Sequence, residues 1–129
     1  MRLFLDTNVV IASVTDEPER GETATQLLNK DHDFYTSLIN LMEIRTVLTK
    51  KKQVERKRVE EVESKIVSGV EILIPDATDM MEANKRQSEN LLYPLDALIL
   101  AYAEGKGTKL VTFDSEILDN GGTHPREVL

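Results

Sequence analysis

The sequence predicts an α/β fold in which helices cover both faces of a parallel sheet. Short runs rich in β-branched or aromatic residues alternate along the chain with longer segments whose apolar residues have helical spacing. The short runs carry apolar residues on consecutive positions, as strands that are buried on both faces do. The chain has 129 residues and neither a linker-like stretch nor an internal repeat, so we expect one domain, residues 1–129.

Each expected element is bounded by residues that favour a turn or a helix end. The expected strands are Leu3–Leu5, Phe34–Thr36, Val70–Ile74 and Leu110–Phe113. The expected helices are Thr23–Lys30, Leu38–Lys50, Val54–Val67, Thr78–Leu92 and Pro94–Glu104.

The last of these helices has the clearest limits. Pro94 suits a first helical position because no N–H has to be satisfied there, and Gly105 and Gly107 favour a stop. Asp96 lies outside the apolar stripe of this helix. The expected stripe consists of Leu95, Leu98, Ile99 and Tyr102.

Composition and charge limit the possible functions. The chain has no cysteine, which excludes disulfides and a thiolate zinc site, and it has no apolar segment of about 20 residues that could span a bilayer. We therefore expect a soluble cytoplasmic protein without a membrane partner. The net charge of −7 repels nucleic acids as a whole, but KKKQVERKR concentrates positive charge between Lys50 and Arg58. This basic cluster is either a phosphate-facing patch or a solvated helix end.

Two aspartates follow strands near opposite ends of the chain. Asp6 ends the apolar run RLFL, and Asp114 follows KLVTF. Ligands of open parallel sheets bind beyond the carboxyl ends of the strands, so these two side chains would meet if their strands are neighbours. Structural alternatives exist for two acids: Asp114 could cap the short helix SEILD, and Asp96 could stabilise the first turn of its helix.

Glu43 is the most informative acid of the sequence. On a helix, its neighbours four residues away are Ile39 and Val47, so its carboxylate emerges from a largely apolar face. An unpaired carboxylate there needs a compensating charge or donor, and Arg45 is too near in sequence to share the face. The alternative is a glutamate at the helix edge that turns into solvent.

If these acids converge, their chemistry points to a hard divalent cation. Carboxylates a few ångströms apart cannot all stay ionised unless a cation shares them, and oxygen ligands suit Mg²⁺ or Mn²⁺. We expect His32 and His124 at the surface rather than at this site. Two cations held by carboxylates can activate water and stabilise the leaving oxygen in phosphodiester hydrolysis.

The pieces FLDTNVVIA, LINLMEIRTVL, PLDALILAYA and LVTFD, in this order between residues 3 and 114, resemble the PIN-domain nucleases. The resemblance implies a three-layer α/β/α single domain of Rossmann-like topology, with a parallel sheet of four to five strands. It implies that Asp6, Glu43, Asp96 and Asp114 bind metal and carry catalysis. Supporting roles in orienting carboxylates, water or phosphate would fall to Thr7, Asn8 and Thr112.

Small PIN domains look most like the VapC toxins of toxin–antitoxin pairs. This resemblance implies a Mg²⁺-dependent (or Mn²⁺-dependent) endoribonuclease that acts on tRNA or another structured RNA. It also implies a homodimer and a cognate VapB-like antitoxin that covers the cleft. RNA binding would then depend on local features such as the Lys50–Arg58 cluster.

Three other functions remain open at this point. The chain could be an RNA-processing PIN nuclease outside a toxin system, or a catalytically silent PIN binding module. A phosphoaspartyl enzyme would also place an aspartate after a strand. The haloacid-dehalogenase type, however, needs a second acid two residues later, where this chain has Asn8.

Overall fold

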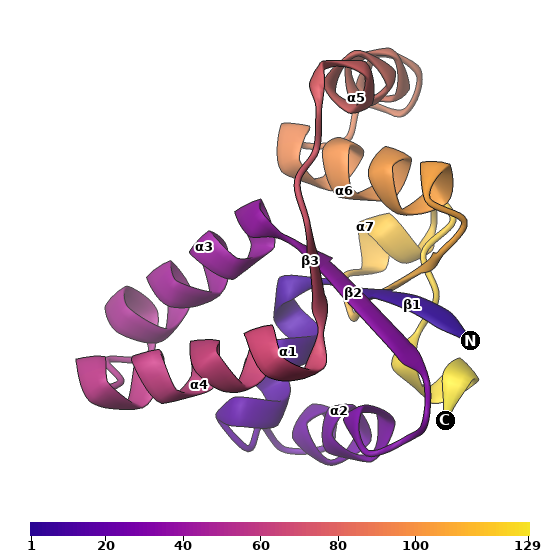
Figure 1. Ribbon diagram of the computed structural model, residues 1–129. Helices are drawn as coiled ribbons and strands as arrows, with labels where there is room; N and C mark the ends of the chain where they lie inside the picture. Colours follow the sequence, from indigo (N-terminus) through magenta and orange to yellow (C-terminus); the bar gives the residue numbers. More distant parts are fainter.

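The computed structural model describes residues 1–129 and contains one sheet of four parallel strands (Figure 1). Their order is β3-β2-β1-β4, so β1 lies inside the sheet with β2 and β4 on either side. The register places Leu3 opposite Phe34 on one side and Lys109 on the other. The strands span Arg2–Leu5 (β1), Asp33–Ser37 (β2), Glu71–Leu73 (β3) and Lys109–Val111 (β4). This arrangement confirms the predicted parallel sheet and brings the two ends of the chain together.

Helices account for most of the remaining chain. They are α1 (Thr7–Val14), α2 (Arg20–Leu28), α3 (Leu38–Thr46), α4 (Arg56–Gly69), α5 (Ala77–Asn90), α6 (Pro94–Gly105) and α7 (Ser115–Leu118). A π-helical turn, η1 (Val47–Lys51), extends α3, and a 3₁₀ turn, η2 (Pro125–Val128), lies near the C-terminus. All five predicted helices are present, with shifted ends. The prediction that α2 begins at Thr23 was wrong by three residues, and α1 was not predicted.

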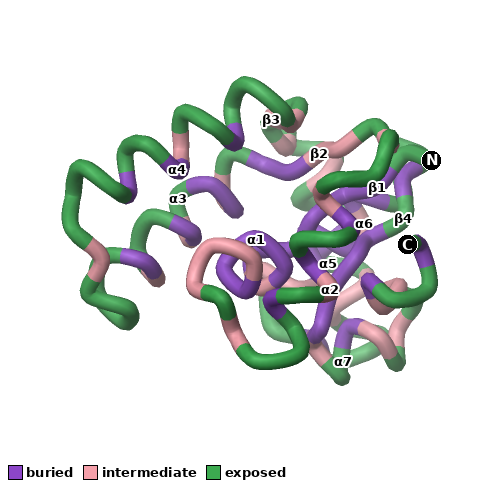
Figure 2. The backbone as a smooth tube through the Cα atoms, turned by 90° about the horizontal axis from the view of Figure 1, so that it is seen from below, coloured by how far each residue is buried: buried purple, intermediate pink, exposed green.

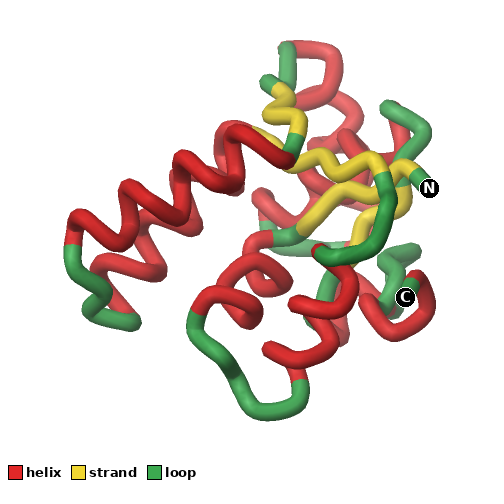
Figure 3. Tube along the Cα trace, turned by 60° about the horizontal axis from the view of Figure 1, so that its bottom comes forward, coloured by secondary structure: helices red, strands yellow, loops and turns green.

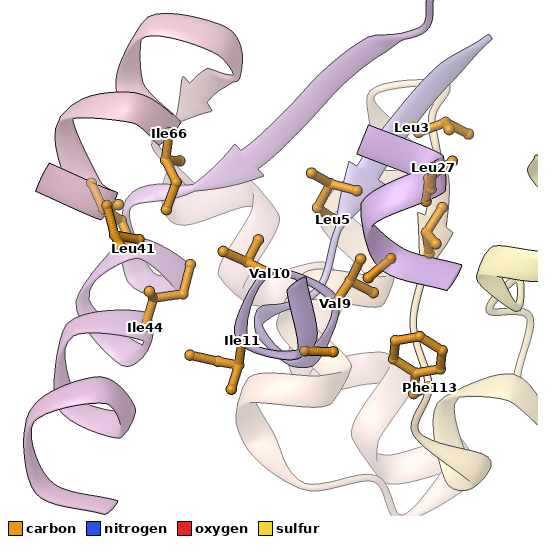
Figure 4. Close-up of a cluster of buried hydrophobic side chains, with 14 of the residues drawn as sticks. Leu3, Leu5, Val9, Val10, Ile11, Leu27, Leu41, Ile44, Ile66 and Phe113 are labelled. Carbon is orange, nitrogen blue, oxygen red and sulfur yellow. The ribbon is translucent and has the colours of Figure 1, made fainter. Parts of the chain in front are cut away.

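Side chains of β1 alternate between two hydrophobic cores, one on each face of the sheet. Leu3 and Leu5 belong to the larger core with α1, α2, α3 and α4. Phe4 points to the opposite face and joins the core formed with α6, β4 and α7. Figure 4 shows Leu3 and Leu5 in the larger core with Val10 of α1 and Ile44 of α3. The two cores confirm that helices cover both faces of the sheet, as Figure 3 also shows.

Strand β4 ends earlier than predicted. The chain leaves the sheet after Val111, and the N–H of Thr112 donates to the carbonyl of Thr123 over 3.0 Å. A single parallel bridge between Val111 and Thr123 continues the sheet edge without forming a fifth strand. Phe113, predicted in the strand, instead packs into the larger core.

Helices α3 and α4 form an arm that projects away from the sheet (Figures 1 and 3). A bidentate ion pair of Arg45 with Glu63 joins them, with N–O distances of 2.6 and 2.7 Å. The basic cluster Lys50–Arg58 lies at the end of this arm, where η1 meets α4. The outer face of α4 is exposed over most of its length (Figure 2). None of the helices combines the length and apolar character needed to cross a membrane.

Candidate active site

Asp6 lies at the carboxyl end of β1, where its side chain caps α1. Only 6% of the residue is exposed. Its carboxylate accepts hydrogen bonds from the N–H of Thr7 at 2.7 Å and the hydroxyl of Thr112 at 2.8 Å. Burial raises the pKa of this carboxyl from 3.8 to about 6, although both hydrogen bonds act in the opposite direction. The negative charges of Glu43 and Asp96 raise this pKa further.

A polar network fixes the end of β4 against the start of α1. The amide Nδ2 of Asn8 donates to Thr112 Oγ1 at 3.2 Å, and its Oδ1 accepts the N–H of Phe113 at 3.1 Å. The N–H of Asp114 donates to Thr112 Oγ1 at 3.0 Å. Asn8 and Thr112, predicted to flank the site, therefore lie beside Asp6, and Thr112 also holds the backbone at Asp114.

Asp114 caps the short helix α7, because its Oδ1 accepts the N–H of Ile117 at 3.0 Å. Asp96 lies in the first turn of α6 and is half-buried. Burial raises the pKa of Asp96 to about 6, and the nearby charges of Asp114, Glu116 and Glu43 add to the shift. Both structural alternatives are thus observed, and they coexist with the effect of the Asp114 charge on the pKa of Asp96.

Glu43 reaches the site from α3. Its neighbours Ile39 and Val47 are half-buried, as is Glu43 itself, which agrees with the apolar surroundings predicted for it. The charge of Glu43 raises the pKa of both Asp6 and Asp96. The predicted acids thus follow β1 and β4 or lie in α3 and α6, and the charges of the three acids other than Asp6 act on Asp6 or Asp96.

Glu116 is an additional acid that sequence reasoning missed. It lies in the first turn of α7, two residues after Asp114, and its charge also raises the pKa of Asp96. The signal in the sequence was the spacing D-x-E directly after a strand, which places both acids at one end of a short helix.

Two buried residues at the junction of β2 and α3 were also missed, namely Ser37 at the end of β2 and Asn40 in the first turn of α3. Ser37 caps α3 and contacts Asn40, whose amide reaches Thr7 at the start of α1. A serine followed three residues later by a polar residue, as in SLIN, is the pattern of a helix N-terminus and could have indicated the cap.

The donor set fits a hard cation. No three His, Cys, Asp or Glu side chains lie close enough together in this structure to hold a metal ion among them. Mg²⁺, however, is commonly held by one or two carboxylates and completes its shell with water and substrate oxygens. The charge of Glu43 raises the pKa of Asp6 and of Asp96, and a cation beside these carboxylates would stabilise their ionised forms.

Both histidines make contacts away from these acids. The Nε2 of His32 lies 3.0 Å from the carbonyl of Val128, and Nδ1 of His124 accepts the N–H of Arg126 at 3.1 Å. Each is half-buried, so the prediction that they are surface residues was only partly correct. Leu95 is likewise only half-buried in α6, whereas Leu98, Ile99 and Tyr102 form part of the buried stripe as predicted.

A separate groove of about 340 Å³ lies between α1, α2 and α4. Two cations, Arg58 and Lys65, are part of its wall. Its apolar lining includes Val10, Val14, Leu28, Phe34, Val62 and Ile66.

The fold places the chain in the class of single α/β domains with a four-stranded parallel sheet. Within this class, a model of the PIN domain matches residues 3–122, and the chain belongs to the PIN-domain family. No curated protein matches the sequence.

Solved structures with the same fold include toxin–antitoxin proteins. A toxin–antitoxin complex from Klebsiella pneumoniae is 24% identical with a TM-score of 0.75, over 95% of this chain and 97% of that chain. VapC20 of Mycobacterium tuberculosis, a toxin that cleaves the sarcin–ricin loop, is 24% identical with a TM-score of 0.78, over 94% of this chain and 96% of that chain. DNA-bound VapBC from Salmonella typhimurium is 23% identical with a TM-score of 0.74, over 96% of both chains. These similarities establish the PIN fold over nearly the whole chain.

Proposed function

We propose that this protein is a Mg²⁺- or Mn²⁺-dependent endoribonuclease and the toxin of a VapBC-type pair. The observation that carries the proposal is the electrostatic coupling of Asp6, Glu43 and Asp96, with Asp114 beside Asp96, at the carboxyl edge of the sheet. PIN-family membership and the VapC-like fold neighbours agree with it.

The four carboxylates are the groups that would hold the cation. When bound, Mg²⁺ or Mn²⁺ supplies a Lewis acid that polarises a phosphodiester and a means of lowering the pKa of water. Thr7 and Thr112 donate hydrogen bonds to Asp6 and so favour its ionised, metal-binding form. Asn8 holds Thr112 and the backbone after β4, which fixes where Asp114 lies.

An RNA substrate fits the combination of one acidic site and a positively charged arm, because the arm can bind RNA phosphates. Lys52, Arg56 and Arg58 each form an ion pair, with Glu17, Glu60 and Glu61, while Lys50, Lys51 and Lys57 have no acidic partner within 4 Å. These unpaired lysines of the Lys50–Arg58 cluster are the groups best suited to contact phosphates.

The partners proposed for this chain are a second copy of itself and a VapB-like antitoxin. The apolar groove between α1, α2 and α4 offers a surface for a segment of the antitoxin, and its walls are mostly hydrophobic. The antitoxin would silence the enzyme by also reaching the carboxylates, where a basic side chain would be stabilised by their negative charges.

Metal dependence and endonucleolytic cleavage can be tested together. We expect the purified protein to cleave an end-labelled structured RNA at internal positions in Mg²⁺ or Mn²⁺, to lose this activity in EDTA and to recover it when metal is restored. Cleavage that persists in EDTA would contradict the proposal, as would removal of nucleotides from the ends only.

A further inference from the structure

A buried chain of hydrogen bonds connects the helix that carries Glu43 with the helix that begins at Asp6. Ser37 Oγ accepts the N–H of Asn40 at 3.1 Å and donates to Asn40 Oδ1 at 2.6 Å. The amide Nδ2 of Asn40 donates to Thr7 Oγ1 at 3.1 Å. The N–H of Thr7 donates to Asp6 Oδ1 at 2.7 Å, so the chain runs from the end of β2 to the carboxylate.

The members of this chain are shielded from solvent. Asn40 is fully buried, and Ser37 and Thr7 are 1% and 5% exposed. Every buried polar side-chain atom in the protein has a hydrogen-bond partner. Removing one partner leaves a desolvated polar group unpaired, which is costly, so the placement of α1 against α3 depends on these contacts.

Asn40 also precedes Glu43 by three residues, which places both side chains on one face of α3. The helix therefore contacts α1 through Asn40 and presents Glu43 to the other acids from the same face. A movement of α3 relative to α1 would change the separation of Glu43 and Asp6.

We infer that Asn40 is a positioning residue of the carboxylate site, whose amide holds α3 against α1 so that Glu43 faces Asp6. The inference rests on the proposed function, since the placement of Glu43 has a consequence for metal binding only if these acids share a cation. An amide suits this position because it accepts a hydrogen bond from one hydroxyl, on Ser37, and donates to another, on Thr7. Leucine has a similar size but can do neither.

The first measurement is Mn²⁺ affinity, read from the free-ion electron paramagnetic resonance signal without any RNA. We expect Asn40→Leu to weaken Mn²⁺ binding about tenfold, as changes behind metal ligands commonly do. The effect should disappear when Asn40→Leu is made in a Glu43→Gln protein, because Asn40 acts through Glu43. Unchanged affinity in Asn40→Leu, or an equal loss in the Glu43→Gln background, would overturn the inference.

Thr36→Val is the matched control. Thr36 is fully buried, and its hydroxyl donates one hydrogen bond, to the carbonyl of Leu5 at 2.8 Å within the sheet, and none to α3. This variant should lose stability but keep Mn²⁺ affinity. An equal loss of affinity in Thr36→Val would show that Asn40 matters only for stability and would overturn the inference.

The second measurement does not need metal. Amide hydrogen exchange in the first turn of α3 should be faster in metal-free Asn40→Leu than in the wild type or in Thr36→Val, and unchanged exchange would overturn the inference. If the wild type binds no Mn²⁺, the proposed function fails, and hydrogen exchange still decides the role of Asn40. If Asn40→Leu does not fold, Thr7→Val removes the same contact and Thr7→Ser retains it, and equal exchange in α3 of these two variants would be decisive against the inference.

Discussion

The hydroxyl of Thr112 donates a hydrogen bond to the carboxylate of Asp6 over 2.8 Å, which joins two residues 106 positions apart in the chain. The contact exists because β1 and β4 are neighbours, although they come from opposite ends of the sequence. Thr112 is completely buried, so this hydrogen bond also links the stability of the fold to the protonation state of Asp6.

Removing this hydroxyl should destabilise the protein at neutral pH. Thr112→Val deletes a donor to a charged, buried carboxylate and the acceptor of the Asn8 amide and the Asp114 N–H. We expect a loss of at least about 2 kcal/mol in the free energy of unfolding. Thr112→Ser keeps the hydroxyl and should lose much less. Urea unfolding of the two variants measures the difference, and equal stability of Val and Ser at this position would show that the hydrogen bond to Asp6 has little value.

The raised pKa of Asp6 makes the metal-free protein less stable as pH rises. The pKa is about 6 in the folded state and about 3.8 in the unfolded state, so the folded protein binds more protons between these values. The favourable contribution is complete below pH 3.8 and is lost as pH rises through 6. Asp6→Asn removes this dependence. In EDTA, the free energy of unfolding of the variant, relative to that of the wild type, should therefore rise by about 2–3 kcal/mol from pH 4 to pH 7. A constant difference between the two proteins over this range would contradict the raised pKa.

Divalent metal should reverse this loss of stability. A ligand that binds only the folded state at a hundred times its dissociation constant stabilises the protein by about 2.7 kcal/mol. We expect Mn²⁺ to raise the melting temperature at pH 7.5 much more than at pH 5, where Asp6 and Asp96 are largely protonated. Calorimetry with and without Mn²⁺ measures the shift, and Asp96→Asn, which removes one proposed ligand, should reduce it. A shift of the same size at both pH values would place the metal elsewhere.

The unpaired lysines of the arm should contribute to RNA binding. Replacing Lys50, Lys51 and Lys57 with glutamine should weaken binding and flatten its dependence on salt, by about 0.7 in log–log slope for each lost phosphate contact with a single strand. Arg56→Gln with Arg58→Gln is the matched control, because both arginines are already paired with glutamates. If the lysine variant binds RNA with an unchanged salt slope, the arm is not a phosphate-binding surface.

The strands could be predicted because their signals are local, and equally local signals identified the four candidate acids. Consecutive apolar residues such as Leu3–Leu5 and Leu110–Val111 indicate buried strands. Asp6 follows the first run directly, and Asp114 comes three residues after Val111. Glu43 was predicted from the helical spacing of Ile39 and Val47, and its half-buried position agrees with that interpretation. The meeting of Asp6 with Thr112, by contrast, required the strand order, which sequence spacing does not contain.

Helix α1 was missed because its sequence, TNVVIASV, is rich in β-branched residues that disfavour an isolated helix. Burial of Val9, Val10, Ile11 and Ala12 and the cap supplied by Asp6 override that preference. The link from Asn40 to Thr7 was missed for a related reason, since it depends on how α3 packs against a helix that had not been predicted.

The central claim, that these carboxylates perform metal-dependent cleavage of RNA, is tested most directly by the cleavage rate of Asp96→Asn. Glu89→Gln is the control, because Glu89 is an exposed acid of α5 that is not among the acids around Asp96. With Mg²⁺ and a structured RNA, we predict that Asp96→Asn loses at least about a hundredfold in rate while remaining folded, and that Glu89→Gln cleaves like the wild type. Wild-type cleavage by a folded Asp96→Asn protein would contradict the account.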